Sequence, residues 1–113
     1  MGFKRRRARP HHFVYVVELD PGILQRKKFR EANPNYARGK DCLYVGMTGL
    51  TPERRFQNHK RGYQANSFVR DYGWHLRADL YPDGNPFPYA EAVKQEAYVA
   101  RELRRLGYGV WQH

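Results

Sequence analysis

The sequence predicts one small domain of the α+β class. Its 113 residues suffice for a single domain with a modest core. Three short runs rich in β-branched and aromatic residues predict strands at residues 13–19, 42–46 and 74–81. Segments with helical character interleave with these runs, which favours a small layered α+β fold. We expect residues 1–12 to be a flexible basic arm and residues 13–113 to be the folded domain.

Turn and capping residues set the limits of the other elements. Residues 20–41 are basic and long for a plain connection, so we expect an insertion that contains a short helix at 24–32. Thr51 fits an N-cap position and Pro52 the first helical position, which predicts a helix to about residue 61. A further helical turn is expected at 67–71. The last helix is predicted from about residue 89 to 106, before a glycine.

The excess of positive charge predicts a polyanionic partner. The chain has 21 Lys and Arg against 11 Asp and Glu, a formal net charge of +10. Lysines and arginines that neutralise phosphates release counterions, so nucleic acid is the favoured partner. A solubilising face or a localisation signal is the alternative explanation for such basic runs. The residues predicted to contact nucleic acid are Arg5, Arg6, Arg7, Arg26, Lys27, Lys28, Arg54, Lys60 and Arg61.

The composition also bears on the compartment. No apolar run approaches the ~20 residues that a membrane span needs, and no secretory leader pattern is present. Cys42 is the only cysteine, which excludes an intrachain disulfide and suits a reducing environment. We therefore expect an intracellular protein that does not act on a membrane.

Glu96 is the most informative residue for function. It falls within the apolar stripe formed by Ala92, Val99 and Leu103 on the last predicted helix. Carboxylates are rarely buried unless they are paired or bind a metal. The pattern leaves two interpretations open: a structural salt bridge to an arginine beneath the helix, or a metal ligand or acid–base group.

Two further pairs of residues could carry chemistry. Arg55 and His59 lie four residues apart on a predicted helix and share one face. An arginine fits phosphate oxygens, and a histidine can relay protons near neutral pH, although generic phosphate binding would also explain the pair. Tyr15 and Tyr44 are central in apolar strands, where core packing with a satisfied hydroxyl is the simpler explanation.

Taken in order, these residues resemble the GIY-YIG nuclease domain. Each motif is nonspecific by itself, whereas the ordered set is more specific and covers residues 13–106. The matching segments are Val14-Tyr15-Val16, Tyr44-Val45-Gly46, the Thr-x-x-x-Pro-x-Arg-Arg-Phe-x-x-His stretch from Thr48 to His59, Trp74, and Ala92 to Glu96.

The resemblance implies a fold and an activity. The implied fold is a small central three-stranded antiparallel sheet flanked by helices. The implied activity is hydrolysis of a DNA phosphodiester with one divalent ion, Mg²⁺ or Mn²⁺. By position, Tyr15 resembles the tyrosine that deprotonates the attacking water, and Tyr44 and Gly46 resemble residues close to the scissile phosphate.

The remaining roles are also carried over by position. Arg55 resembles the arginine that stabilises the pentacovalent phosphate, with Arg54 as its rival, and His59 resembles a neighbouring proton relay. Glu96 resembles the sole carboxylate ligand of the metal. We further expect nearby positive charge to lower the pKa of Tyr15 and so favour the phenolate.

The sequence therefore predicts a metal-dependent DNA endonuclease, with DNA favoured over RNA. The alternative from a different class is a non-catalytic nucleic-acid-binding module on the same scaffold. Members of the family usually carry a separate DNA-binding domain. We therefore expect targeting here to come from DNA structure, from a partner protein or from a homodimer.

Overall fold

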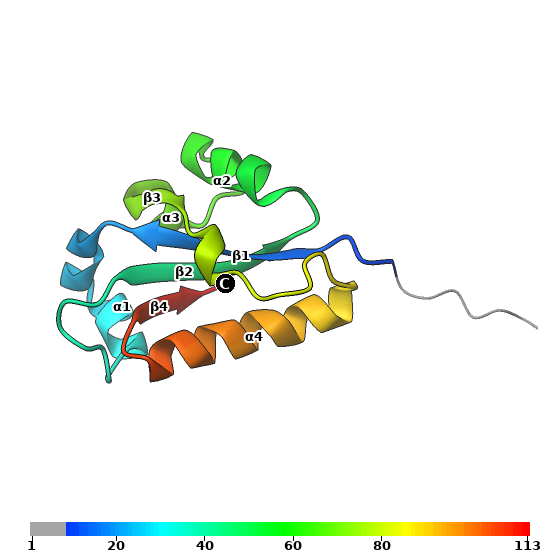
Figure 1. The fold of residues 1–113 in the computed structure, drawn as a ribbon. Helices are drawn as coiled ribbons and strands as arrows, with labels where there is room; N and C mark the ends of the chain where they lie inside the picture. The colour runs from blue at the N-terminus through cyan, green and yellow to red at the C-terminus, as the bar shows by residue number, and fades with distance from the viewer. Residues whose placement is uncertain (1–8) are drawn as a thin grey trace, which may run out of the picture.

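The chain folds into an α+β domain built on a four-stranded mixed sheet. The computed structural model describes residues 9–113, and the N-terminal arginines Arg5, Arg6 and Arg7 lie outside this range. The strand order is β3-β1-β2-β4 (Figure 1). The strands are β1 (Phe13–Leu19), β2 (Cys42–Thr48), β3 (Gly73–Leu76) and β4 (Gly109–Gln112).

The prediction of three antiparallel strands is wrong in one respect. The strands β1, β2 and β3 are antiparallel as expected, but β4 adds a parallel neighbour to β2. In the β2–β4 ladder, Tyr44 pairs with Trp111 and Val45 with Gln112. The third strand is also shorter than predicted, because the chain leaves β3 at Leu76 and forms the 3₁₀ helix η2 (Ala78–Leu80).

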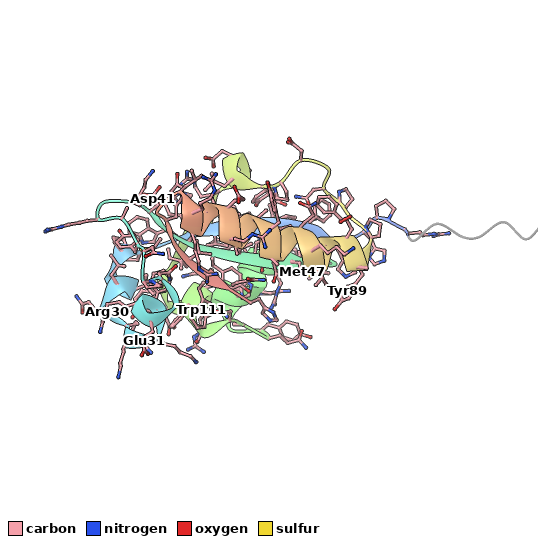
Figure 2. The ribbon with its side chains drawn as sticks, turned by 90° about the horizontal axis from the view of Figure 1, so that it is seen from below. Arg30, Glu31, Asp41, Met47, Tyr89 and Trp111 are labelled. Carbon is pink, nitrogen blue, oxygen red and sulfur yellow. The ribbon has the colours of Figure 1, made fainter. Side chains whose placement is uncertain are left out.

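Helices cover both faces of the sheet. The long helix α4 (Tyr89–Arg105) lies across one face, and α2 (Pro52–Arg61) and α3 (Ser67–Tyr72) lie on the other (Figure 1). Figure 2 shows α4 in front of the sheet, with Tyr89 and Met47 near one end of the helix. One core contains Val16 and Val45 of the sheet together with residues of α4. The opposite core contains Tyr15 and Tyr44, so alternation along the strands directs both tyrosines away from α4.

The two helices predicted at 52–61 and 67–71 are confirmed, and both lie on the face of the sheet opposite α4. The Thr51 hydroxyl accepts a hydrogen bond from the Arg54 amide, Pro52 is the first residue of α2, and Gly62 ends the helix with a φ of 84°. The short helix expected at 67–71 is α3, whose N-cap is Asn66. These features are local in sequence, which explains why the pattern of residues predicts them well.

The basic insertion at 20–41 is ordered and attached to the sheet. It contains the 3₁₀ helix η1 (Pro21–Gln25) and α1 (Lys27–Ala32), so the predicted single helix is interrupted at Arg26. Asn33 follows α1 and is buried. Its side-chain amide donates to the carbonyls of Phe29 and Val110, and its oxygen accepts from the Val110 amide at 2.7 Å. One side chain thus joins the insertion to β4.

Backbone pairing begins one residue before β1. His12, predicted to belong to the arm, forms an isolated antiparallel bridge with Phe87. Within residues 9–113, no helix is long and apolar enough to cross a membrane.

We predict that Asn33→Ala lowers the free energy of unfolding by about 2–3 kcal/mol, because it leaves buried backbone groups of Val110 and Phe29 without partners. Urea denaturation checks this. Asn35→Ala is the matched control, since Asn35 is exposed and its replacement should change stability by less than about 0.5 kcal/mol. Equal stability of the two variants would show that the anchor is dispensable.

Candidate functional site

Two buried tyrosines meet above a glycine in the centre of the sheet. Tyr15 pairs with Gly46 across β1 and β2, and Tyr44 precedes Gly46 by two residues on the same face. A Cβ atom at Gly46 would lie 3.0 Å from each tyrosine hydroxyl and 2.7 Å from Cε1 of Tyr44. The space at this position is therefore filled by the two phenols, and the chain needs glycine there.

His59 completes this group from α2. Its Nε2 lies 2.8 Å from the Tyr15 hydroxyl, and its Nδ1 accepts a hydrogen bond from the Asn66 amide at 3.0 Å. Because Nδ1 is an acceptor, the proton of the neutral ring is on Nε2, and Nε2 donates to the Tyr15 oxygen. Burial, assisted by the charge of Arg55, lowers the pKa of His59 to about 4, which keeps the ring neutral at pH 7.

This arrangement alters the predicted role of His59. A ring whose Nε2 already carries a proton cannot accept one from Tyr15. In the described state, His59 therefore orients the Tyr15 hydroxyl and donates to its oxygen.

The two phenols are harder to ionise than free tyrosine. Burial, with the neighbouring Tyr44 as the second cause, raises the pKa of Tyr15, and the positive charge of Arg55 only partly opposes this. Burial raises the pKa of Tyr44 to about 12, and the carboxylate of Glu96 acts in the same direction. Our expectation of a lowered pKa for Tyr15 is wrong for the free protein, because the loss of solvation exceeds the attraction of the cation.

Arg55, rather than Arg54, stands beside the tyrosines. Its charge acts on the pKa values of Tyr15 and Tyr44, and its guanidinium donates to the Gln64 carbonyl at 2.9 Å. Arg54 is exposed and faces a different hollow on the outer side of α2. Neighbouring positions on a helix differ by about 100°, which is why only one of the two can face the phenols.

Glu96 approaches the same end of the sheet from the opposite face. Its side chain is only 6% exposed. One carboxylate oxygen accepts a hydrogen bond from Gln112 Nε2 at 3.1 Å, while the other, Oε2, is buried with no hydrogen-bond partner among residues 9–113. Its charge reaches Tyr44, and His113 lies close enough to Glu96 and His59 to shift the pKa of each. The carboxylate therefore lies near Tyr44 and His113, at the edge of the group of phenols.

The environment of Glu96 bears on the two interpretations that the sequence leaves open. Within the part of the chain that the structure describes it forms no ion pair, so the structural salt bridge to an arginine is not present there. Burial raises the pKa of its carboxyl group. Glu96 also lines an open hollow of about 350 Å³ together with Thr48 and His113. Glu96 therefore combines one carboxylate oxygen without a partner among residues 9–113 with a place at the edge of a hollow.

This donor set fits one hard cation. Within the described range, no three or more His, Cys, Asp or Glu residues are grouped closely enough to hold a metal by themselves. Magnesium commonly takes one or two protein carboxylates and completes its shell with waters and phosphate oxygens. The Oε2 atom of Glu96 is the one that could serve such an ion.

The predicted basic contacts fall into two groups. Lys60 and Arg61 are engaged within the protein: the Lys60 ammonium donates to the carbonyls of Arg70 and Gly73, and Arg61 donates to Asn58. Arg26, Lys27 and Lys28 are exposed on the insertion.

The insertion brings positive charge to the tyrosine face. The Lys28 ammonium lies 5.7 Å from the ring centre of Trp111, which neighbours Tyr44 in the sheet. The guanidinium of Arg26 lies 5.7 Å from the ring centre of Phe68, and the Phe68 ring packs against Trp111. Basic and aromatic groups therefore continue from the phenols toward the insertion.

Four residues of this site escaped the sequence analysis. Asn66 fixes the tautomer of His59, Gln112 orients Glu96, and Trp111 and His113 flank the phenols and the carboxylate. Asn66 carries a recognisable signal as an N-cap before Ser67. The other three depend on β4, which the pattern of residues does not predict.

We predict that Gly46→Ala destabilises the protein by about 1–3 kcal/mol, since the new methyl group overlaps Tyr44 and both hydroxyls. Thermal unfolding measures the effect. Gly49→Ala is the control, because a Cβ there meets only His12 at 3.4 Å, an ordinary contact. An alanine at position 46 that costs no more than one at 49 would contradict the crowding described here.

The comparisons with known proteins found no match. No family model, no curated protein and no solved structure matches it significantly. The functional assignment therefore rests on the geometry of the two phenols, His59, Arg55 and Glu96.

Proposed function

We propose that this protein is a metal-dependent endonuclease that hydrolyses DNA phosphodiester bonds, in the manner of the GIY-YIG nucleases that its sequence resembles. One observation carries the proposal: two tyrosine hydroxyls meet at a glycine beside a neutral histidine and an arginine, and Glu96, close enough to affect Tyr44, keeps one buried oxygen without a partner among the described residues. A packed core needs neither an arginine beside buried phenols nor a buried carboxylate without a cation.

The side chains divide the chemistry among them. Arg55 binds the phosphate oxygens and neutralises the charge that develops on them, a task for which the guanidinium fork is suited. Glu96 would hold Mg²⁺ or Mn²⁺, which would supply Lewis-acid stabilisation of the phosphate. Gly46 leaves the space that brings the two phenol hydroxyls together, and these hydroxyls would meet the phosphate.

Tyr15 is the proposed base. Its oxygen accepts a hydrogen bond from the Nε2–H group of His59, so its own hydroxyl proton is not used in that bond and can point elsewhere. Loss of that proton leaves a phenolate stabilised by His59 and Arg55, and the phenolate can take a proton from the attacking water. Tyr44 lies beside it, with ring centres 6.1 Å apart, and its hydroxyl is available to hydrogen-bond a phosphate oxygen.

The second candidate is a non-catalytic nucleic-acid-binding module. One observation favours it: both tyrosines are only 1% exposed, so their hydroxyls are nearly closed to a substrate in this structure. DNA is the proposed partner ahead of RNA. Targeting by a partner protein, by DNA structure or through a homodimer stays a prediction for either candidate.

We predict that the purified protein nicks supercoiled, linear or branched DNA in Mg²⁺ or Mn²⁺ and is inactive in EDTA. Glu96→Gln should reduce the rate by at least about 100-fold, because it removes the metal-binding charge while its amide oxygen can still accept from Gln112. Gel assays of nicking measure both effects.

Glu91→Gln is the matched control for this experiment, since Glu91 is an exposed acid on the same helix. It should cleave at the wild-type rate. DNA binding without cleavage in every metal tested would exclude the nuclease and leave the binding module.

We also predict that the cleavage rate rises with pH across pH 6–9, by about tenfold per unit, in single-turnover assays. The raised pKa of Tyr15 means that the phenolate is a minor species whose fraction grows tenfold for each pH unit. Tyr15→Phe should abolish cleavage, whereas Tyr44→Phe should slow it and keep the slope. A flat pH profile, or a Tyr15→Phe enzyme as fast as the wild type, argues against Tyr15 as the base.

A further inference from the structure

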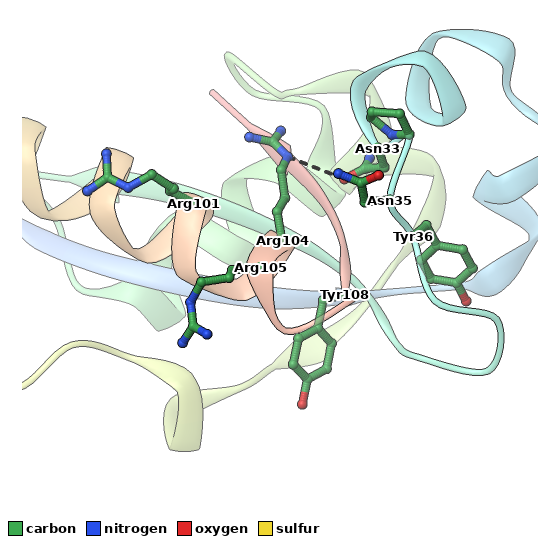
Figure 3. A pocket seen from close by; sticks show the side chains of 8 residues that line it. Asn33, Asn35, Tyr36, Arg101, Arg104, Arg105 and Tyr108 are labelled. Carbon is green, nitrogen blue, oxygen red and sulfur yellow. Dashed lines mark hydrogen bonds between the residues drawn. The ribbon is translucent and has the colours of Figure 1, made fainter.

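A hollow lined by basic side chains lies at the far end of α4, away from the tyrosines. It measures about 230 Å³ and opens between the last turns of α4 and the loop that follows α1 (Figure 3). Three arginines of α4 contribute to its wall: Arg101, Arg104 and Arg105. The loop contributes polar and aromatic side chains, among them Asn33 and Tyr36.

Arg104 is a partly buried cation that is held by neutral groups. Its guanidinium donates to Asn33 Oδ1 at 3.3 Å and to the Val110 carbonyl at 3.0 Å. Burial lowers its pKa, and no carboxylate of residues 9–113 forms an ion pair with it. These two bonds use two of the five N–H groups of the guanidinium, so donors remain for a ligand.

The neighbouring charges make the hollow more positive. Arg101 lies over the exposed ring of Tyr98, at 5.6 Å, and Lys40 lies 4.9 Å from the ring centre of Tyr108 at the edge of the hollow. Of the three arginines, only Arg105 has a carboxylate partner in the described part of the chain, Glu102 at 3.0 Å. Cations near the C-terminus of a helix favour its dipole, but this would not require Arg104 to be buried beside polar loop residues.

The arrangement of charged and aromatic residues around the hollow indicates which anion fits. A second hollow of about 400 Å³ lies on the other side of the loop and shares Asn33, Pro34 and Tyr36 with the first. Arg30 lines it. Cations in two adjoining hollows with an aromatic residue between them are typical of surfaces that follow a nucleic-acid strand.

We propose that the hollow formed by Arg101, Arg104 and Arg105 binds a phosphate group of a nucleic-acid strand, at a site separate from the phenols and Glu96. Glu96 and Arg104 are eight residues apart on one helix, or about 12 Å along its axis. Successive phosphates of one strand rise about 3.4 Å along the axis of a duplex, so this distance corresponds to between three and four phosphate steps along that axis. One DNA molecule can therefore engage both places. The phosphate is either an internal phosphodiester or a terminal 5′-phosphate.

The test compares charge removal at the hollow with charge removal elsewhere on α4. Anisotropy of a labelled single-stranded 12-mer is measured in EDTA from 50 to 200 mM NaCl, so the result does not depend on cleavage. Arg101→Gln together with Arg105→Gln should weaken binding about tenfold and reduce the salt slope by one to two, roughly one for each phosphate that the variant no longer neutralises. Both side chains are exposed, so the fold should tolerate these changes.

Lys94→Gln and Arg101→Gln form the matched pair of single variants, since each removes one exposed charge from the same helix. The proposal requires a larger loss of affinity for Arg101→Gln. Oligonucleotides with and without a 5′-phosphate distinguish the terminal from the internal source. Equal effects of the two single variants would overturn the proposal. A variant that loses binding to polyglutamate, an acidic polypeptide, but still binds DNA would also overturn it. Neither result would bear on the nuclease assay.

Discussion

The approach of two phenol rings to the backbone of Gly46 is the constraint on which the candidate site depends. It requires Tyr15 to face Gly46 across the β1–β2 ladder and Tyr44 to share its face of the sheet. A register shift of one residue would turn one tyrosine toward α4 and separate the two hydroxyls. The pairing of two buried strands therefore fixes the position of the reactive groups, and α2 only has to deliver His59 and Arg55 to a prepared place.

Burial controls the protons of this site more strongly than charge does. By its effect on their pKa values, it keeps His59 neutral and both tyrosines protonated in the free protein, although Arg55 lies beside them. The backbone of Asn66 then decides which nitrogen of His59 carries the proton. On the proposed function, Arg55 on the tyrosine face meets the phosphate, while the negative group, Glu96, comes from the helix on the opposite face.

The sequence predicts the parts of this structure that depend on neighbouring residues. The N-cap at Thr51, the end of α2 at Gly62 and the burial of Glu96 follow from local patterns. The strand β4 does not, because its four residues pair in parallel with a strand more than sixty residues earlier. The direction in which the pKa of Tyr15 shifts could not be predicted either, because the sequence shows nearby cations but not the loss of solvation on burial.

The length of β4 explains how helices on opposite faces can serve one site. A continuous sheet would separate Glu96 on α4 from the phenols beneath α2, and no side chain could pass through it. However, β4 pairs with β2 only from Cys42 to Val45, so within the described residues no strand covers that edge of β2 at Gly46. Gln112, the last paired residue of β4, holds the Glu96 carboxylate at this opening. A longer β4 would close it.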